Sequence, residues 1–204
     1  MAGPAHRPQA LPGLLVAAGF LAGQEQVRPA VRALLADWLV GTALELGLLP
    51  ETLQLAISCL DRFLQAALAG LARDQLQLVA ATALLIAAKY EETFPPAVSD
   101  LSYLTAGGAA GPAVLAMERR MLASLGWSLG GPRHQQFLRW ARLADPELVR
   151  PVTHCLAQYL AELSPVDHGL AHLAASARAA AAVALATMVP TTIPLHAAST
   201  CPKY

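Results

Sequence analysis

The chain has few charged and few aromatic residues for its length. Of 204 residues, 14% are charged, 5% are aromatic and 55% are hydrophobic. This composition excludes an intrinsically disordered chain, which needs high charge and low hydrophobicity. Lysine and arginine number 14, as do aspartate and glutamate, so there is no basic excess to neutralise nucleic-acid phosphates. We therefore expect a folded protein that binds no nucleic acid. The scarcity of surface charge is a first indication of a protein partner.

Metal-binding and catalytic motifs are also absent from the sequence. The three cysteines, Cys59, Cys155 and Cys201, are far apart and show no CxxC or Cys/His spacing, which leaves a zinc site without support. No metalloprotease, P-loop, nucleophile-elbow or dinucleotide-binding motif occurs. We expect no enzymatic activity, no bound metal and no cofactor.

Long apolar runs are missing as well, which argues against a membrane protein. No uninterrupted run reaches the roughly 18 residues of a membrane-spanning helix. Residues 11–23 form a shorter apolar stretch interrupted by Pro12 and Gly13. Three interpretations remain open for this stretch: a signal-peptide core, a poorly ordered leader, or a short helix packed on the folded domain.

The apolar residues that are present predict an all-α fold. Alanine and leucine dominate, whereas there are only three isoleucines, which favours helix over strand. After a poorly ordered leader at 1–27, helical periodicity predicts a first domain over 28–130. The third of its helices is apolar on all sides between Leu76 and Ala88, as a central buried helix is. The five helices are expected near 31–46, 51–69, 73–90, 97–103 and 112–125.

A second set of helices follows Gly130-Gly131-Pro132. Helices are expected near 133–143, 146–163 and 170–188, and the small-residue segment 172–183 resembles segment 77–88. We interpret 131–189 as a partial internal repeat of the first domain. It is incomplete because no residues remain for a fourth and fifth helix before the irregular tail at 190–204.

Four charged residues interrupt apolar helical stripes. Arg32 shares a helix face with Leu35 and Leu39, and Asp61 interrupts the apolar face of the next helix. A buried charge is tolerated only when it is paired, so we expect Arg32 and Asp61 to form an internal ion pair. Lys89 and Glu118 also interrupt apolar stripes. They either form a second internal salt bridge or lie in an apolar surface that docks a partner.

A further apolar stripe lies on the first helix of the domain. Val31, Leu34, Leu35 and Trp38 have the spacing of one helix face. Such a stripe belongs either to the core or, because Arg32 and Leu39 already define an inward face, to an exposed apolar groove.

Four sequence blocks together resemble the cyclin family. They match the mitotic A/B-type cyclin box in order and spacing, cover residues 28–143 well and extend loosely to 188. Within the family they are similar to the divergent cyclin P group. The blocks are VRALLADWLV (31–40), ETLQLAISCLDRFL (51–64), LQLVAATALLIAAKYEETFPP (76–96) and MERRMLASLGWSL (117–129).

The resemblance implies a fold and a partner. It implies a cyclin fold, with a five-helix cyclin box around a central helix and an incomplete second cyclin-like repeat. Cyclins are non-catalytic subunits of cyclin-dependent Ser/Thr kinases, so it implies a heterodimer, a cell-cycle role and a nuclear or cytoplasmic location. The family's buried Arg–Asp pair falls on Arg32 and Asp61. Its Lys and Glu that hold the kinase αC helix fall on Lys89 and Glu118, which favours the docking alternative. The remaining kinase-binding positions are Ile86, Tyr90, Glu92, Leu122, Trp127 and Leu129.

The resemblance also implies a patch that docks substrates with Arg-x-Leu motifs. The acidic residue that attracts the docking arginine is Gly41 here, so such docking should be weakened. The incomplete repeat leaves one alternative open, a degenerate cyclin-fold scaffold that binds a kinase without activating it. The patch falls on Val31, Leu34, Leu35, Trp38, Leu76 and Gln77.

Overall fold

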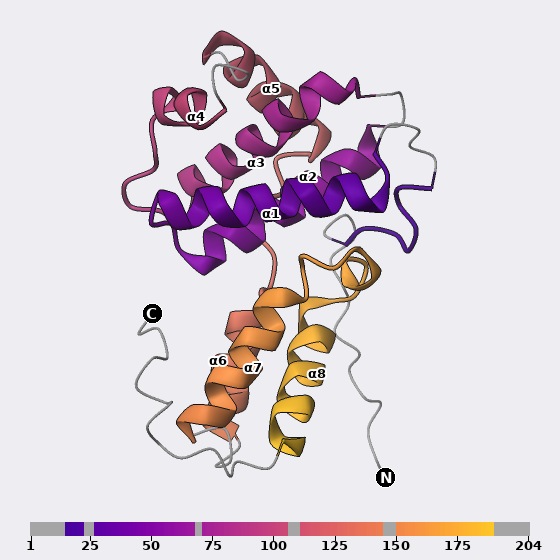
Figure 1. Cartoon of the computed structure of the whole chain (residues 1–204), viewed down its shortest axis with the longest axis vertical. Helices are drawn as coiled ribbons and strands as arrows, with labels where there is room; N and C mark the ends of the chain where they lie inside the picture. The colour runs from indigo at the N-terminus through magenta and orange to yellow at the C-terminus, as the bar shows by residue number, and fades with distance from the viewer. Residues whose placement is uncertain (1–14, 23–26, 68–70, 106–110, 145–149, 190–204) are drawn as a thin grey trace.

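The computed structural model describes residues 15–22, 27–67, 71–105, 111–144 and 150–189. In these ranges all the regular secondary structure is helical, which confirms the all-α class. The helices form two units, α1 to α5 and α6 to α8, which occupy opposite ends of the molecule (Figure 1). No helix among the described residues is both long and apolar enough to cross a membrane.

The first unit is built around α3. Every residue of α3 from Val79 to Ala88 is buried, and α3 packs against the other four helices of the unit. This is the central helix that the apolar segment from Leu76 to Ala88 predicts. The helices are α1 (Pro29–Glu45), α2 (Pro50–Ala66), α3 (Leu76–Glu91, preceded by the 3-10 turn Arg73–Gln75), α4 (Val98–Leu104) and α5 (Gly111–Ser124).

Proline and glycine set the ends of these helices. Pro29 and Pro50 occupy the first turns of α1 and α2. An N–H group in the first turn has no acceptor within the helix, so a proline there costs no hydrogen bond. Gly47 ends α1 with φ of 63°, a conformation that glycine adopts without steric cost. The expected boundaries therefore lie within a few residues of the observed ones.

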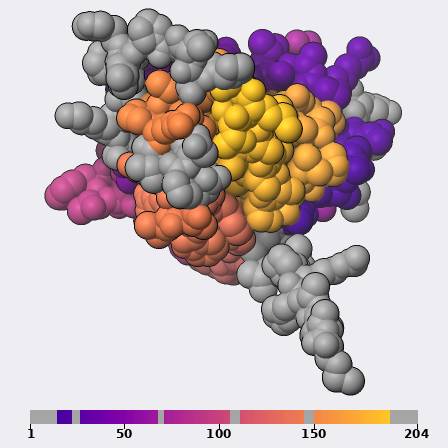
Figure 2. All heavy atoms as spheres, turned by 90° about the horizontal axis from the view of Figure 1, so that it is seen from below, coloured from indigo at the N-terminus to yellow at the C-terminus, as the bar shows by residue number. Residues whose placement is uncertain are grey.

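The second unit is smaller and more open. It contains α6 (His134–Ala144), α7 (Pro151–Leu163) and α8 (Ala175–Met188), with the 3-10 turn His168–Leu170 between the last two. Its core consists mainly of alanines from α7 and α8 packed on Leu138. Leu185 and Met188 of α8 are exposed, and Figure 2 shows α8 at the molecular surface. The Ala-rich helix is therefore only partly covered, as an incomplete repeat predicts.

Part of the expected leader packs on the first unit. Val16 and Leu21 are buried, and the Ala17 N–H donates to Gln65 Oε1 at 2.6 Å. Segment 15–22 forms turns rather than a helix. Of the three interpretations of this stretch, the structure agrees with a segment packed on the folded domain, but the segment is not a helix. The rest of the leader up to residue 14, and the tail at 190–204, lie outside the described residues.

Candidate functional site

Arg32 and Asp61 form the expected ion pair. Arg32 lies on α1 and Asp61 on α2, and both are buried. The Arg32 Nε donates to Asp61 Oδ1 at 2.8 Å, and its Nη2 donates to Oδ2 at 2.7 Å. This two-point geometry matches the guanidinium fork to the carboxylate. The pair fixes the crossing of α1 and α2, which is a structural role.

Arg32 has additional partners that the sequence pattern did not reveal. Its Nη1 donates to the Val166 carbonyl at 2.6 Å, and its Nη2 donates to the Pro165 carbonyl at 2.7 Å. Both carbonyls belong to the segment that follows α7. The guanidinium therefore connects the two helical units as well as the two helices. Backbone acceptors leave no side-chain pattern, so no sequence signal pointed to them.

Lys89 and Glu118 lie side by side at the surface of the first unit. The Lys89 Nζ and the Glu118 Oε1 are 2.7 Å apart. The Lys89 side chain is 44% exposed and that of Glu118 is 14% exposed. In the chain alone the two charges thus form the internal salt bridge that was one of the two alternatives. Because the pair is accessible, its charges can still be offered to a partner.

Two aromatic side chains are exposed at the ends of the helices that carry this pair. Tyr90 directly follows Lys89 and is 53% exposed, and Trp127 is 71% exposed. The Tyr90 hydroxyl lies against Gly130, where an added Cβ would come within 2.7 Å of it. Leu122 and Leu129 are half-buried at the edge of the core. These side chains belong to the end of α3, to α5, which packs on α3, and to the segment after α5. We call Lys89, Tyr90, Glu118, Leu122, Trp127 and Leu129 the α3–α5 surface.

The end of α5 holds Trp127 in an unusual backbone conformation. The Gly126 N–H donates to the Ala123 carbonyl at 3.1 Å, and the Trp127 N–H donates to the Leu122 carbonyl at 3.0 Å. These two bonds are those of a Schellman motif. Gly126 has φ of 58°, and Trp127 has φ of 59°. A left-handed conformation costs a non-glycine residue about 1–2 kcal/mol, and such strain concentrates at functional sites.

Two residues assigned to kinase binding have other surroundings. Ile86 is only 2% exposed and belongs to the hydrophobic core, so in the chain alone it offers almost no surface to a partner. Glu92 accepts hydrogen bonds from the Leu49 N–H at 2.8 Å and from the Thr52 Oγ1 at 2.6 Å. A carboxylate is favoured at this position because it faces the N-terminus of α2. Glu92 is therefore already engaged within the chain.

A neighbouring ion pair, which the sequence analysis missed, ties the two units together near the α3–α5 surface. Glu91, at the end of α3, pairs with Arg133, just before α6. Arg133 was expected at the start of the helix near 133–143, and that position gave no indication of a partner at the end of α3.

The apolar stripe of α1 lies partly in the core and partly at the surface. Val31, Leu35 and Trp38 are half-buried and pack on the core, whereas Leu34 is exposed. Gln77 and Gly41 are exposed as well. Leu76 is buried in the chain alone, so among the residues of the expected docking patch it offers almost no surface.

Comparison with protein families assigns both units. The chain matches the cyclin N-terminal domain over residues 14–130 and the cyclin C-terminal domain over residues 132–200. The first match includes segment 15–22, in agreement with its packing on α1 to α5.

Individual relatives are mitotic cyclins of the B type. The chain is 43% identical to G2/mitotic-specific cyclin-B2 of Oryzias javanicus over 160 residues, which are 78% of this chain and 41% of the relative. It is 42% identical to G2/mitotic-specific cyclin-B1 of Oryzias latipes over 170 residues, 83% of this chain and 41% of the relative. It is 40% identical to G2/mitotic-specific cyclin-B of Patella vulgata over 174 residues, which are 85% of this chain and 41% of the relative. The chain thus spans about two-fifths of the length of these relatives.

A solved structure supports the same fold. A viral cyclin from herpesvirus saimiri superimposes with a TM-score of 0.72 at 22% identity, and the match covers 88% of this chain and 79% of the viral one. The same assignment is supported by the two helical units, by the buried Arg32–Asp61 pair that the family resemblance implies, and by both family matches. The chain belongs to the cyclin family.

Proposed function

We propose that this chain is a regulatory subunit that binds a cyclin-dependent Ser/Thr kinase through the α3–α5 surface. The observation that carries the proposal is the exposure of Tyr90 and Trp127 at the ends of α3 and α5, the two helices that carry the Lys89–Glu118 pair. Large aromatic side chains next to a few charges are typical of the energetically dominant centre of a protein interface. The sequence resemblance assigns Lys89 and Glu118 to contact with the kinase αC helix, and Tyr90 and Trp127 to the apolar kinase-facing positions.

The mechanism we propose is a shift of the kinase between two conformations. In an active kinase, the αC helix is turned inward so that its glutamate pairs with the catalytic lysine. A partner that contacts only the inward αC helix stabilises the active state by the difference in contact free energy. The α3–α5 surface would provide apolar contacts from Trp127 and Leu122, and directional hydrogen bonds from the charged pair.

Lys89 and Glu118 need not separate to act in this way. A carboxylate has lone pairs for more than one donor, and an ammonium group has three N–H donors. Lys89 and Glu118 can therefore stay bonded to each other at 2.7 Å while each also binds one polar group of the αC helix. Lys89, being the more exposed member, has the greater freedom to reorient.

Charge reversal of the pair tests the proposal. The double variant Lys89→Glu, Glu118→Lys keeps the internal salt bridge but exchanges the charges offered to a partner. We expect it to melt like the parent and to lose co-purification with a panel of monomeric cyclin-dependent kinases. Arg119→Glu is the control, because Arg119 is an exposed charge on α5 outside the surface. Unchanged kinase binding by the double variant would contradict the proposal.

A second candidate function is a cyclin-fold scaffold that binds a kinase without activating it. A specific observation favours it: α8 is partly uncovered, and a cavity of about 290 Å³ beside it is lined by leucines. A loosely covered second unit gives the kinase fewer fixed contacts. A kinase assay on the purified complex distinguishes the two functions, because the scaffold binds without raising phosphate transfer.

We further propose a weak substrate-docking patch at α1 and a cell-cycle role in the nucleus or cytoplasm. Leu34 and Gln77 are exposed there, and Trp38 is half-buried. Gly41 offers no carboxylate to a docking arginine. We expect Arg-x-Leu peptides to bind weakly, and Gly41→Glu to strengthen their binding, as measured by fluorescence polarisation.

A further inference from the structure

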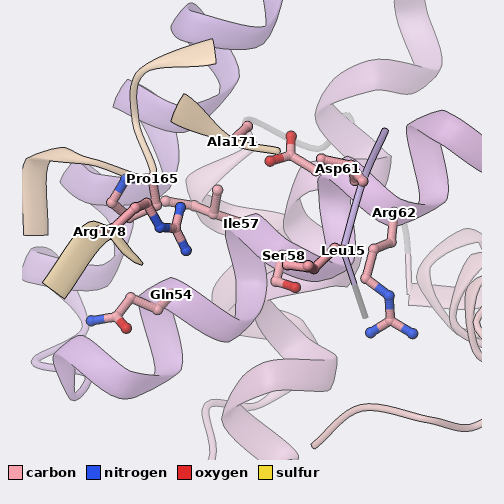
Figure 3. A pocket seen from close by; sticks show the side chains of 10 residues that line it. Leu15, Gln54, Ile57, Ser58, Asp61, Arg62, Pro165, Ala171 and Arg178 are labelled. Atoms are coloured by element: carbon pink, nitrogen blue, oxygen red, sulfur yellow. The ribbon is translucent and has the colours of Figure 1, made fainter. Parts of the chain in front are cut away.

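A cationic side chain that forms no ion pair with another described residue lies at the junction of the two units. Arg178, in the first turn of α8, lines a cavity of about 60 Å³ together with Gln54 and Ser58 of α2 and with Pro165 of the second unit (Figure 3). Its Nε is buried without a hydrogen-bond partner. Within the described part of the chain its guanidinium makes no ion pair. Asp61 also lines the cavity and attracts Arg178 at a distance, but among the described residues it makes its ion pair with Arg32.

The charges around this cavity do not balance. Arg62 and Arg178 of the lining are positive, whereas Asp61 is the negative residue of the lining and gives both oxygens to Arg32. His134 interacts with Arg178, and burial together with that charge lowers the pKa of His134 to about 3, so that it is neutral. The first turn of α8 adds the positive end of a helix dipole. Burying such a charge without a partner is costly.

The other polar groups at the cavity are suited to an anion. The Nε2 of Gln54 is buried and donates to no acceptor, and Ser58 lines the same cavity. A guanidinium fork binds two oxygens of a phosphate or carboxylate at once. About 60 Å³ is room for several water molecules, and hence for an anion of four or five heavy atoms.

We propose that this cavity binds a small oxyanion through Arg178, Gln54 and Ser58. The bound anion neutralises the guanidinium of Arg178 and accepts a hydrogen bond from the amide of Gln54. Because Gln54 and Ser58 belong to α2 and Arg178 to α8, the anion joins the two helical units. None of these residues belongs to the α3–α5 surface, so the site is independent of the proposed kinase binding.

Inorganic phosphate is the probe for this site. The full chain is titrated with phosphate at constant ionic strength, set by sodium chloride, and followed by 31P NMR line broadening and by thermal unfolding. A hundredfold excess over the dissociation constant should raise the melting temperature by ~5–10 °C. Sulfate and acetate titrations then show whether the site prefers a tetrahedral or a planar oxyanion.

Variants separate a site from a general salt effect. Arg178→Met keeps the length of the side chain and removes its charge, and Arg142→Met makes the same change at an exposed position of α6. We expect Arg178→Met to lose line broadening and thermal stabilisation by phosphate, and Arg142→Met to keep both. Without phosphate, Arg178→Met should melt at or above the temperature of the parent, because an unpaired buried charge is gone.

A second variant covers the case in which Arg178→Met does not fold. Gln54→Leu keeps the charge of Arg178 and should weaken phosphate binding roughly tenfold, as loss of one hydrogen bond to a charged group does. Equal responses of the parent and the Arg178 variant would overturn the proposal. So would a parent that broadens no phosphate signal, or a Gln54 variant that binds phosphate as tightly as the parent.

Discussion

The guanidinium of Arg32 binds the carboxylate of Asp61 and two backbone carbonyls of the other helical unit at the same time. Its Nε and Nη2 take the two Asp61 oxygens, and its Nη1 and Nη2 take the carbonyls of Val166 and Pro165. Four of the five N–H groups of this guanidinium thus donate hydrogen bonds to these acceptors. The pair therefore contributes both to the cyclin box and to the placement of the second unit on it.

Asp61→Ala should destabilise the chain strongly. The substitution leaves Arg32 buried with only carbonyl partners, and removing one member of a buried pair costs about 3–5 kcal/mol. Natural domains have only ~5–15 kcal/mol of unfolding free energy. We expect largely unfolded or insoluble protein, measured by circular dichroism and thermal melting. Asp37→Ala is the control, because Asp37 is exposed on the same pair of helices. A variant that melts like the parent would show that the pair contributes little.

Hydrogen exchange should differ sharply between the two central helices. The segment from Val79 to Ala88 of α3 is buried throughout, whereas α8 exposes Leu185 and Met188. Local opening of a poorly covered helix exposes little new apolar surface and is therefore frequent. We expect strong protection over α3 and weak protection over α8, measured by mass spectrometry. Equal protection would indicate that another part of the chain covers α8.

The helices and the buried ion pair could be predicted from the sequence because they leave periodic patterns. The all-apolar segment from Leu76 to Ala88 identified the central helix, and the opposite charges of Arg32 and Asp61 within apolar faces identified their pairing. Pro29, Pro50 and Gly47 lie at helix ends, where the local backbone chemistry of proline and glycine suits them. Each of these signals is contained in a short stretch of chain.

Contacts between distant segments could not be predicted in the same way. The bonds of Arg32 to the carbonyls after α7 involve backbone atoms that every residue carries. Glu92 was assigned to partner binding, but it binds the N-terminus of α2 because the end of α3 lies beside it. Ile86 is in the core because α3 is covered on all sides, and periodicity does not distinguish its faces. Arg178 lies within an alanine-rich run, and only the folded chain shows that it lines one cavity with residues of α2 and pairs with no described carboxylate.

Acidification should destabilise the chain through His134. Burial and the charge of Arg178 lower the pKa of His134 from 6.5 to about 3. Between these values the unfolded chain binds a proton that the folded chain does not, so this contribution is complete above pH 6.5 and decreases as the pH falls towards 3. The loss is about 1.4 kcal/mol per pH unit within this window.

Denaturant unfolding at several pH values measures this dependence. His134→Leu should flatten the profile between pH 6.5 and 3, since it removes the group that titrates only in the unfolded chain. His172→Leu, in the segment before α8, controls for the loss of a histidine elsewhere in the second unit. An identical pH profile for parent and His134→Leu would contradict the argument.

Single alanine variants of the Lys89–Glu118 pair should separate stability from binding. A salt bridge with one exposed member contributes only ~0–1 kcal/mol to folding, so Lys89→Ala and Glu118→Ala should each melt within about 4 °C of the parent. Truncating a charge that a partner desolvates costs about 2–5 kcal/mol, which is roughly 30-fold to several-thousand-fold in Kd. Calorimetric titration with a monomeric cyclin-dependent kinase checks the binding, and unchanged affinity in both variants would favour a purely internal role.

Trp127→Asn should lose partner binding while folding at least as well as the parent. Trp127 has φ of 59° and is 71% exposed, so its ring gains little from packing while its backbone is strained. Asparagine tolerates the left-handed conformation better than other non-glycine residues, and we expect the free energy of unfolding to stay equal or to rise by up to ~1 kcal/mol. Losing a large exposed aromatic from the centre of an interface typically costs ≥ ~2 kcal/mol of binding free energy, or about 30-fold in Kd. Trp140→Asn, at an exposed tryptophan of α6, is the matched control and should leave kinase affinity unchanged. If Trp127→Asn instead unfolds at lower temperature and binds the kinase as before, the strained backbone serves the packing of α5 rather than the presentation of Trp127.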